Sequence, residues 1–202
     1  MKKILIFTIF LLGFSAFATN ENPTNCPTTD KGVVINGIRW ATRNVDAPGT
    51  FAKSPESPGM FFQWNRRKGW NAVDEEVEGW DNSIPEGTKW YAENDPCPEG
   101  WRVPTFDELR ILRDVDNVKT TLNGVNGTLF GTTLFLPFAG SRSTAGRLLN
   151  TAGRWGWYWS STQGADTRWA WAGHLFLGND GSTSVSIFGN PIVAYPVRCV
   201  AK

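Results

Sequence analysis

The sequence predicts an α+β fold with a small twisted antiparallel sheet, at least one helix and long irregular loops. Its 202 residues include 11 Trp, 13 Phe and 21 Gly but only two Met and one His, a composition typical of irregular β architecture. One segment carries the signals of a helix, and several short apolar runs in the second half are separated by turn residues. The length after the first residues is that of one domain.

The first half contains one predicted hairpin followed by loops. Residues 19–31 are polar and are interpreted as a flexible leader. A turn at Asn36-Gly37 lies between two β-rich runs, which predicts strands at 33–35 and 38–41. Residues 46–95 are rich in Pro, Gly, Ser and Asn, yet they contain large aromatic side chains, so we expect long loops packed around a core. These side chains are Phe51, Phe61, Phe62, Trp64, Trp70, Trp80 and Trp90.

The predicted helix spans about residues 106–115. Thr105 and Glu108 have the spacing of a capping box, and Leu109 and Leu112 fall on one helical face together with Phe106. The second half is predicted to form a sheet, with strands at 128–140, 156–162, 168–177, 182–188 and 194–200.

The first residues predict export. Lys2 and Lys3 precede an apolar run at 4–14, and Ala16-Phe17-Ala18 fits a signal-peptidase site, so residues 1–18 are interpreted as a signal peptide. The apolar run is much shorter than the ~20 residues of a spanning helix. The expected location is the cell surface, the outer envelope or the extracellular space.

The charge balance gives no reason to expect nucleic acid or an anionic membrane as a partner. Without Lys2 and Lys3, the 20 basic residues fall to 18, against 19 acidic ones.

Three cysteines in an exported chain predict one disulfide and one remaining thiol. Cys97 and Cys199 lie in stretches that look structured, whereas Cys26 lies in a polar segment, so we expect a Cys97–Cys199 bond. A lipid anchor at Cys26 is disfavoured because the residues before it, 23–25, are Pro-Thr-Asn rather than a small residue that ends the apolar run.

The residues offer little for catalysis. His174 is the single histidine, which excludes multi-histidine zinc sites and weakens any Ser-His-Asp reading, and we expect it to fill a strand position. No phosphate-binding glycine motif is present. We therefore predict no enzyme and no cofactor.

One acidic segment could still hold a calcium ion, although its spacing matches no EF-hand. The segment comprises Asp74, Glu75, Glu76, Glu78 and Asp81.

Five tryptophans are predicted to project from two neighbouring strands. Residues two apart face the same side of a strand, so Trp155, Trp157 and Trp159 project together, as do Trp169 and Trp171. One small core does not need five indoles. We expect Trp159 to build the core and the others to offer an aromatic surface for a sugar ring or a protein partner.

Six sequence motifs, called phrases below, occur in order along the chain: RWATRNV (39–45), FFQWN (61–65), DPCPEGWRVPTFDEL (95–109), LPFAGSR (136–142), GWYWSST (156–162) and VRCV (197–200). Together they resemble the Fibrobacter succinogenes major paralogous domain, a family of exported bacterial domains, over about residues 32–200. The resemblance implies a C-type-lectin-like domain at 32–202, with Cys97 and Cys199 as the family's structural pair and no enzyme activity. It also implies scaffold roles for Trp101, Arg102, Pro104, Trp159, Ser160 and Ser161.

The resulting hypothesis is a noncatalytic binding module for a glycan or for a host or bacterial surface protein, with a role in adhesion. The expected ligand-binding residues are Trp155, Trp157, Asp166, Arg168, Trp169, Trp171, Asn179, Asp180 and Asn190. Asn179-Asp180 and Asn190-Pro191 are also similar to calcium and sugar ligands of C-type lectins, which leaves calcium-dependent sugar binding as an alternative. Two further alternatives remain. The protein could be a structural subunit of a surface assembly, or a hypervariable receptor of the retroelement-diversified type.

Overall fold

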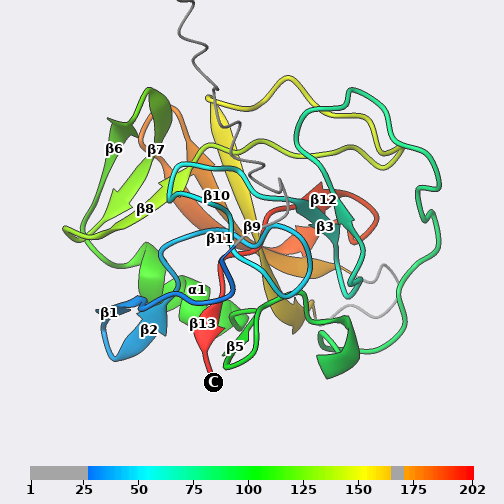
Figure 1. Ribbon diagram of the computed structural model, residues 1–202, viewed down its shortest axis with the longest axis horizontal. Coiled ribbons are helices and arrows are strands. Elements are labelled where there is room, and N and C mark those ends of the chain that lie inside the picture. Colours follow the sequence, from blue (N-terminus) through cyan, green and yellow to red (C-terminus); the bar gives the residue numbers. More distant parts are fainter. Residues whose placement is uncertain (1–26, 165–170) are drawn as a thin grey trace, which may run out of the picture.

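The computed structural model describes residues 27–164 and 171–202. Within these residues the chain forms four small antiparallel sheets and the helix α1, so the fold is mixed α+β and mostly β (Figure 1). No helix in the described ranges is long and apolar enough to cross a membrane. The predicted signal peptide, residues 19–26 of the leader and residues 165–170 lie outside the described part.

The first sheet brings the two ends of the domain side by side (Figure 1). Its order is β1-β2-β13-β5, with β1 at Val33–Ile35, β2 at Ile38–Trp40, β13 at Val200–Ala201 and β5 at Trp101–Arg102. The turn residues Asn36 and Gly37 both have positive φ, 48° and 82°, as the predicted hairpin requires. The Cys97–Cys199 disulfide also forms, as expected, and joins the C-terminal segment to the chain just before β5.

Residues 27–31, which the sequence assigned to the flexible leader, are held against the domain. The Pro27 carbonyl accepts a hydrogen bond from the backbone N–H of Phe51. The carboxylate of Asp30 accepts hydrogen bonds from Gly32, Thr42 and Arg43, and these contacts hold its pKa below the usual range although burial alone would raise it. The described part of the leader is therefore anchored rather than free.

The loop region between Asp46 and Asp95 packs its aromatic rings as predicted. Six of the seven Phe and Trp side chains named above are buried, and Trp80 is partly buried. The sequence missed the short strands within this region, β3 at Phe61–Gln63 and β4 at Gly69–Trp70, and the 3-10 turn at Ala92–Asn94. β3 lies between β4 and β12, which spans Ala194–Tyr195.

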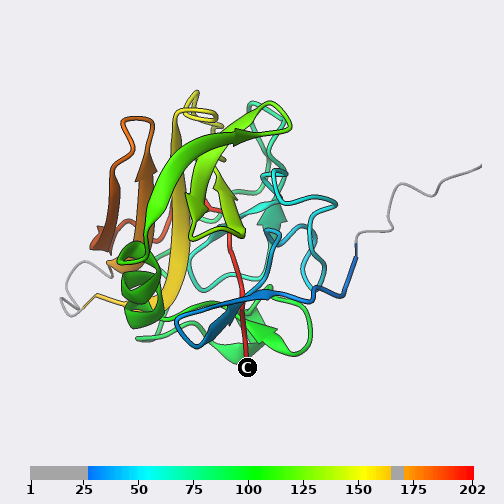
Figure 2. The same cartoon turned by 90° about the vertical axis from the view of Figure 1, so that its left-hand side faces the viewer.

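The helix α1 spans Phe106–Arg113 and begins with the predicted capping box of Thr105 and Glu108. It ends two residues earlier than predicted, because Asp114 is its C-cap. Leu109 and Leu112 are buried and share a core with Tyr158, Leu175 and Leu177, because α1 packs against the sheet formed by segments of residues 155–189 (Figure 2).

The third sheet contains a hairpin that the sequence analysis overlooked. β6 at Asn117–Leu122 pairs with β7 at Val125–Phe130, and β7 pairs with β8 at Leu134–Pro137. The predicted single strand at 128–140 is therefore two strands. The turn residues Asn123 and Gly124 both have positive φ, as at the first hairpin.

The fourth sheet contains Trp155, Trp157 and Trp159. β9 spans Trp155–Gln163, β10 spans Ala172–Gly178 and β11 spans Thr183–Gly189, in the order β11-β10-β9 (Figure 2). One face of this sheet packs into a core with α1 through side chains such as Tyr158, Leu175 and Leu177. The last predicted strand, 194–200, is instead the two short strands β12 and β13.

Candidate binding face

The outer face of the fourth sheet holds a row of rings, which we call the aromatic ladder. In the antiparallel register Trp157 lies opposite Phe176, and Trp159 lies opposite His174, so these side chains share one face. Tyr195 of β12 joins them from outside the sheet. The ladder thus comprises Trp155, Trp157, Trp159, His174, Phe176 and Tyr195.

Ring contacts fix the order of the ladder. The Trp155 and Trp157 centroids are 6.1 Å apart and nearly perpendicular. Trp157 stacks on Tyr195 at 5.8 Å with an angle of 15° between the planes, and Phe176 lies 5.5 Å from Trp157. Tyr195 is also 4.3 Å from Trp159. Rings that contact one another on several sides have little freedom to reorient, so the surface is preorganised.

Exposure rises along the ladder from Trp159 to Trp155. Trp159 is fully buried, and its indole N–H donates to the Phe62 carbonyl oxygen at 2.6 Å. Trp157 is partly exposed and Trp155 is 41% exposed. The interpretation of Trp159 as a core residue is confirmed, and the accessible part of the ladder is its Trp155 end.

A carboxylate lies on the ladder face near the accessible end. Gly178 pairs with Trp155 across the sheet, and a side chain at Gly178 would meet the carboxylate of Asp180, so this exposed residue lies on the same face as that indole. Asn179 is exposed in the same turn. Hydrogen bonds from Ser182 hold the pKa of Asp180 below its usual range, which keeps this carboxylate charged.

Two serines of β11 also lie on the ladder face, and the sequence analysis did not select them. Ser184 is opposite Phe176, and Ser186 is opposite His174. Ser184 is exposed. The alternation of Ser with apolar residues in STSVSIF (182–188) was the available signal for this face.

Trp171 lies apart from the ladder. Its ring contacts Phe188 at 6.2 Å. A side chain at Gly189 would meet Trp159 and His174, which places residue 189 on the ladder face and Phe188 on the opposite face. Phe188 is 66% exposed, so this pair is a second apolar feature at the edge of the sheet.

The remaining predicted ligand residues are not part of the described ladder. Asn190 is partly buried, and its side-chain oxygen accepts a hydrogen bond from the backbone N–H of Ile192, which is a turn-forming contact. Asp166, Arg168 and Trp169 lie outside the described residues.

His174 fills a strand position in β10, as the sequence predicts. It is 9% exposed, and its Nδ1 atom has no hydrogen-bond partner among the described residues. Burial lowers the pKa of His174 to about 4, while a hydrogen bond with the backbone of Ala172 acts in the opposite direction.

The low pKa of His174 makes stability depend on pH. The unfolded chain binds a proton near pH 6.5 and the folded chain only near pH 4, so stability is lost as the pH falls between these values. We expect the free energy of unfolding to be about 2 kcal/mol lower at pH 5 than at pH 7. Urea unfolding at the two pH values measures this difference. The His174→Phe variant should remove most of it, and an unchanged difference would contradict the assignment.

The carboxylates of the acidic segment at residues 74–81 do not gather around one point. Glu76 pairs with Arg147 and Asp81 pairs with Arg66, while Asp74 accepts a hydrogen bond from Asn71. The described residues contain no group of three or more His, Cys, Asp or Glu side chains placed to hold a metal ion.

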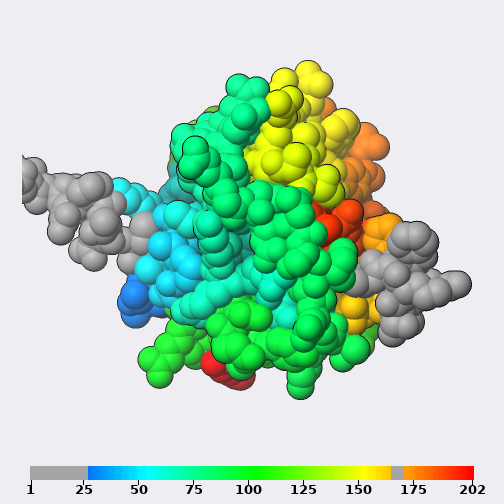
Figure 3. All heavy atoms as spheres, turned by 90° about the vertical axis from the view of Figure 1, so that its right-hand side faces the viewer, coloured from blue at the N-terminus to red at the C-terminus, as the bar shows by residue number. Residues whose placement is uncertain are grey.

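Buried Arg142 fixes this acidic loop to the domain. Its guanidinium donates to the backbone carbonyls of Asn71, Asp74 and Gly146. Leu148 adds a backbone hydrogen bond to Glu75, and Figure 3 shows the loops around residues 75 and 148 side by side on one face of the molecule.

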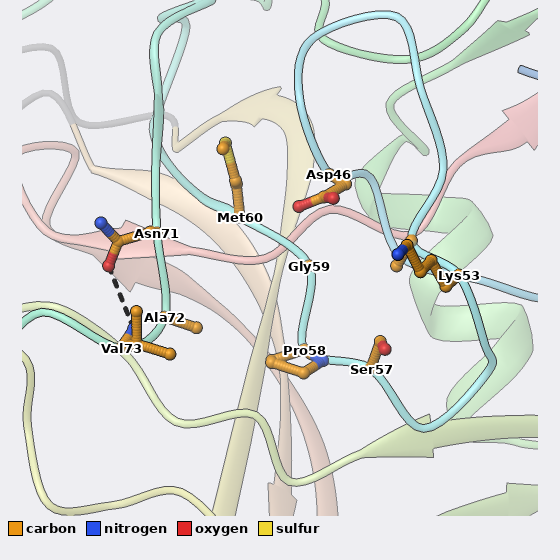
Figure 4. A pocket seen from close by; sticks show the side chains of 10 residues that line it. Asp46, Lys53, Ser57, Pro58, Gly59, Met60, Asn71, Ala72 and Val73 are labelled. Carbon is orange, nitrogen blue, oxygen red and sulfur yellow. Dashed lines mark hydrogen bonds between the residues drawn. The ribbon is translucent and has the colours of Figure 1, made fainter. Parts of the chain in front are cut away.

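The loop region of the described residues contains hollows away from the ladder, and three of them are large enough to consider. One, of about 310 Å³, has Asp46 and Lys53 on one side and Asn71 and Val73 on the other (Figure 4). A second, of about 630 Å³, adjoins it at Lys53 and includes Arg43. The third, of about 310 Å³, is lined by residues of 65–66 and 83–94.

The fold and the site therefore define a mostly β domain with a preorganised aromatic face and separate loop hollows. Comparisons with models of protein families, with curated proteins and with solved structures found no match.

Proposed function

We propose that this protein is a noncatalytic exported binding module that recognises a glycan through the Trp155 end of the aromatic ladder. The observation that carries the proposal is the exposed Trp155 ring, held by Trp157, with the Asp180 carboxylate on the same face near Gly178, the cross-strand partner of Trp155. The six sequence phrases support membership of the Fibrobacter succinogenes major paralogous domain family and a C-type-lectin-like fold.

The chemistry of the face favours a sugar as the ligand. A sugar ring has an apolar C–H face, which stacks on an indole, and hydroxyl groups, which need hydrogen-bond partners at the margin. Trp155 and Phe176 of the ladder provide the apolar surface, and Ser184 and Asp180 on the same face provide hydrogen-bond partners.

The described titratable groups support a binding role rather than catalysis. The pKa values of Tyr158 and Tyr195 are raised to about 12 and that of Arg198 is lowered to about 10, in each case mainly by burial. Tyr158 and Arg198 are packed in cores, whereas Tyr195 is a ladder ring that packs against Trp157 and Trp159, and none of the three lines the hollows described above. Their shifts thus reflect packing.

A glycan array probed with the wild type and with Trp155→Ala tests the proposal. Trp155 is the most exposed ladder indole, so its removal should weaken binding by about tenfold while leaving the fold intact. The matched control is Ile111→Ala, because Ile111 is 40% exposed on α1, away from the ladder. Repeating the array with calcium and with a chelator tests the calcium-dependent alternative.

The expected outcome is selective binding that Trp155→Ala weakens by about tenfold and that Ile111→Ala retains. Binding to no glycan by a folded protein would overturn the proposal in favour of a protein ligand.

A structural role in a surface assembly is the second candidate, and Phe188 favours it. This 66% exposed ring lies in β11, one of the two edge strands of its sheet, where an exposed apolar side chain favours association. Light scattering of the purified protein should then show a stable oligomer that Phe188→Ala dissociates. A monomer at all concentrations would remove this candidate.

A further inference from the structure

The third hollow lies between the segment after β3 and the loop that leads to Trp90. Its volume of about 310 Å³ is near the lower end of the roughly 300–1,000 Å³ range of small-molecule sites, which suits a ligand of a single ring. Its lining is mainly polar, from Arg66, Ser83, Glu86, Tyr91 and Asn94. The exposed apolar side chain of Ile84 also lines it.

Buried Asn65 holds the two walls together. Its backbone has positive φ, 54°, and its side-chain oxygen accepts hydrogen bonds from the backbone N–H of Tyr91 and from the side chain of Asn94. Its side-chain amide donates to the carbonyl of Glu86 at 3.0 Å. One side chain thus fixes three residues of the opposite wall, so the hollow is formed before any ligand arrives.

The positions of Tyr91 and Arg66 are also fixed. The Tyr91 phenol lies so close to Gly87 that a side chain there would overlap it, and Gly87 has a φ of 90°, which favours glycine. The Arg66 guanidinium donates to Ser83 at 2.6 Å and pairs with Asp81 at 3.0 Å. The hollow therefore presents an oriented phenol and an oriented guanidinium.

We propose that this hollow binds one neutral monosaccharide unit, as a site separate from the ladder. The Glu86 carboxylate, the Tyr91 phenol and the Asn94 amide can bond to several hydroxyl groups of one ring, and Ile84 offers a surface for its C–H face. Arg66 is balanced by Asp81, and Glu86 adds a negative charge, so an anionic sugar is disfavoured. The proposal does not rest on glycan binding by the ladder.

Nuclear magnetic resonance of the Ile-methyl-labelled protein tests this site directly. The probes are glucose, galactose, mannose and N-acetylglucosamine, each titrated separately. At least one of these monosaccharides should bind with a dissociation constant on the order of 1 mM and shift the Ile84 methyl signal. Because Ile84 lines the hollow, its signal reports this site whatever the glycan array shows for the ladder.

The Glu86→Gln variant should weaken that binding by about tenfold. Gln keeps the size of the side chain but loses the charge-assisted hydrogen bond, and the backbone carbonyl that Asn65 holds is unchanged. The matched control is Glu93→Gln, since Glu93 is exposed in the neighbouring 3-10 turn and does not line the hollow. The proposal is overturned if no probe shifts Ile84 at about 50-fold the expected dissociation constant, if sialic acid binds better, or if Glu86→Gln binds equally well.

Discussion

Replacing Cys97 and Cys199 together by Ser is expected to lower the free energy of unfolding by about 4 to 5 kcal/mol. The bond closes a loop with a sequence separation of 102 residues, and closing so long a loop removes much conformational entropy from the unfolded chain. The bond also ties the residues before β13 to those before β5, the two short strands that pair in the first sheet. Urea unfolding followed by Trp fluorescence measures the change.

The wild type in reducing conditions should behave like the double variant, because both lack the same bond. Cys26→Ser is the matched control, since it removes a cysteine and leaves the bond intact. It should unfold at the same urea concentration as the wild type. Equal stability of the wild type with and without reductant would show that the bond contributes nothing.

Local signals in the sequence predicted the elements that depend on few residues. The capping box of Thr105 and Glu108 placed the start of α1, and the Asn36-Gly37 turn placed the first hairpin. The same Asn-Gly signal at 123–124 was available for β6 and β7, and the period-2 pattern there is diluted by Thr and Asn residues.

Short strands with distant partners could not be predicted in this way. β13 has two residues, too few for any periodicity, and it exists because Val200 pairs with both Trp40 and Arg102. Such pairing depends on the tertiary fold rather than on local propensity.

The binding face was predictable in outline but not in its details. Alternation in β9 gave the shared side of Trp155, Trp157 and Trp159. The ring that covers the inner end is Tyr195, which comes from a distant strand, so no local pattern reveals it. The β10–β11 pairing shifts its register between Ala172 and His174, and Trp171, just before this shift, contacts Phe188, which is not a ladder ring.

Substitution of buried Arg198 is also expected to lower the free energy of unfolding strongly. Its guanidinium is fully buried and donates to the Asn44 side chain at 2.9 Å and to the backbone carbonyls of Ala41 and Phe135. The side-chain amide of Asn44 in turn donates to the Pro58 carbonyl, so one cation connects three distant segments. Burial lowers its pKa to about 10, which still leaves it charged at pH 7.

Arg198→Ala is expected to lower the free energy of unfolding by about 3 to 5 kcal/mol. The substitution leaves a cavity and also leaves buried oxygen acceptors unpaired. Urea unfolding again provides the measurement. Arg39→Ala is the matched control, because Arg39 is exposed and its guanidinium donates to the nearby Lys31 carbonyl; it should change stability by about 0.5 kcal/mol or less.

Arg198→Met separates the two causes of that loss. Met fills much of the same space and makes no hydrogen bond, so any loss that remains in this variant reports the unpaired oxygens of Asn44, Ala41 and Phe135. We expect this variant to lie between Arg198→Ala and the wild type. If Arg198→Met matches the wild type, the buried cation fills space without stabilising the fold through its hydrogen bonds, as can occur when a buried charge is replaced by an apolar side chain.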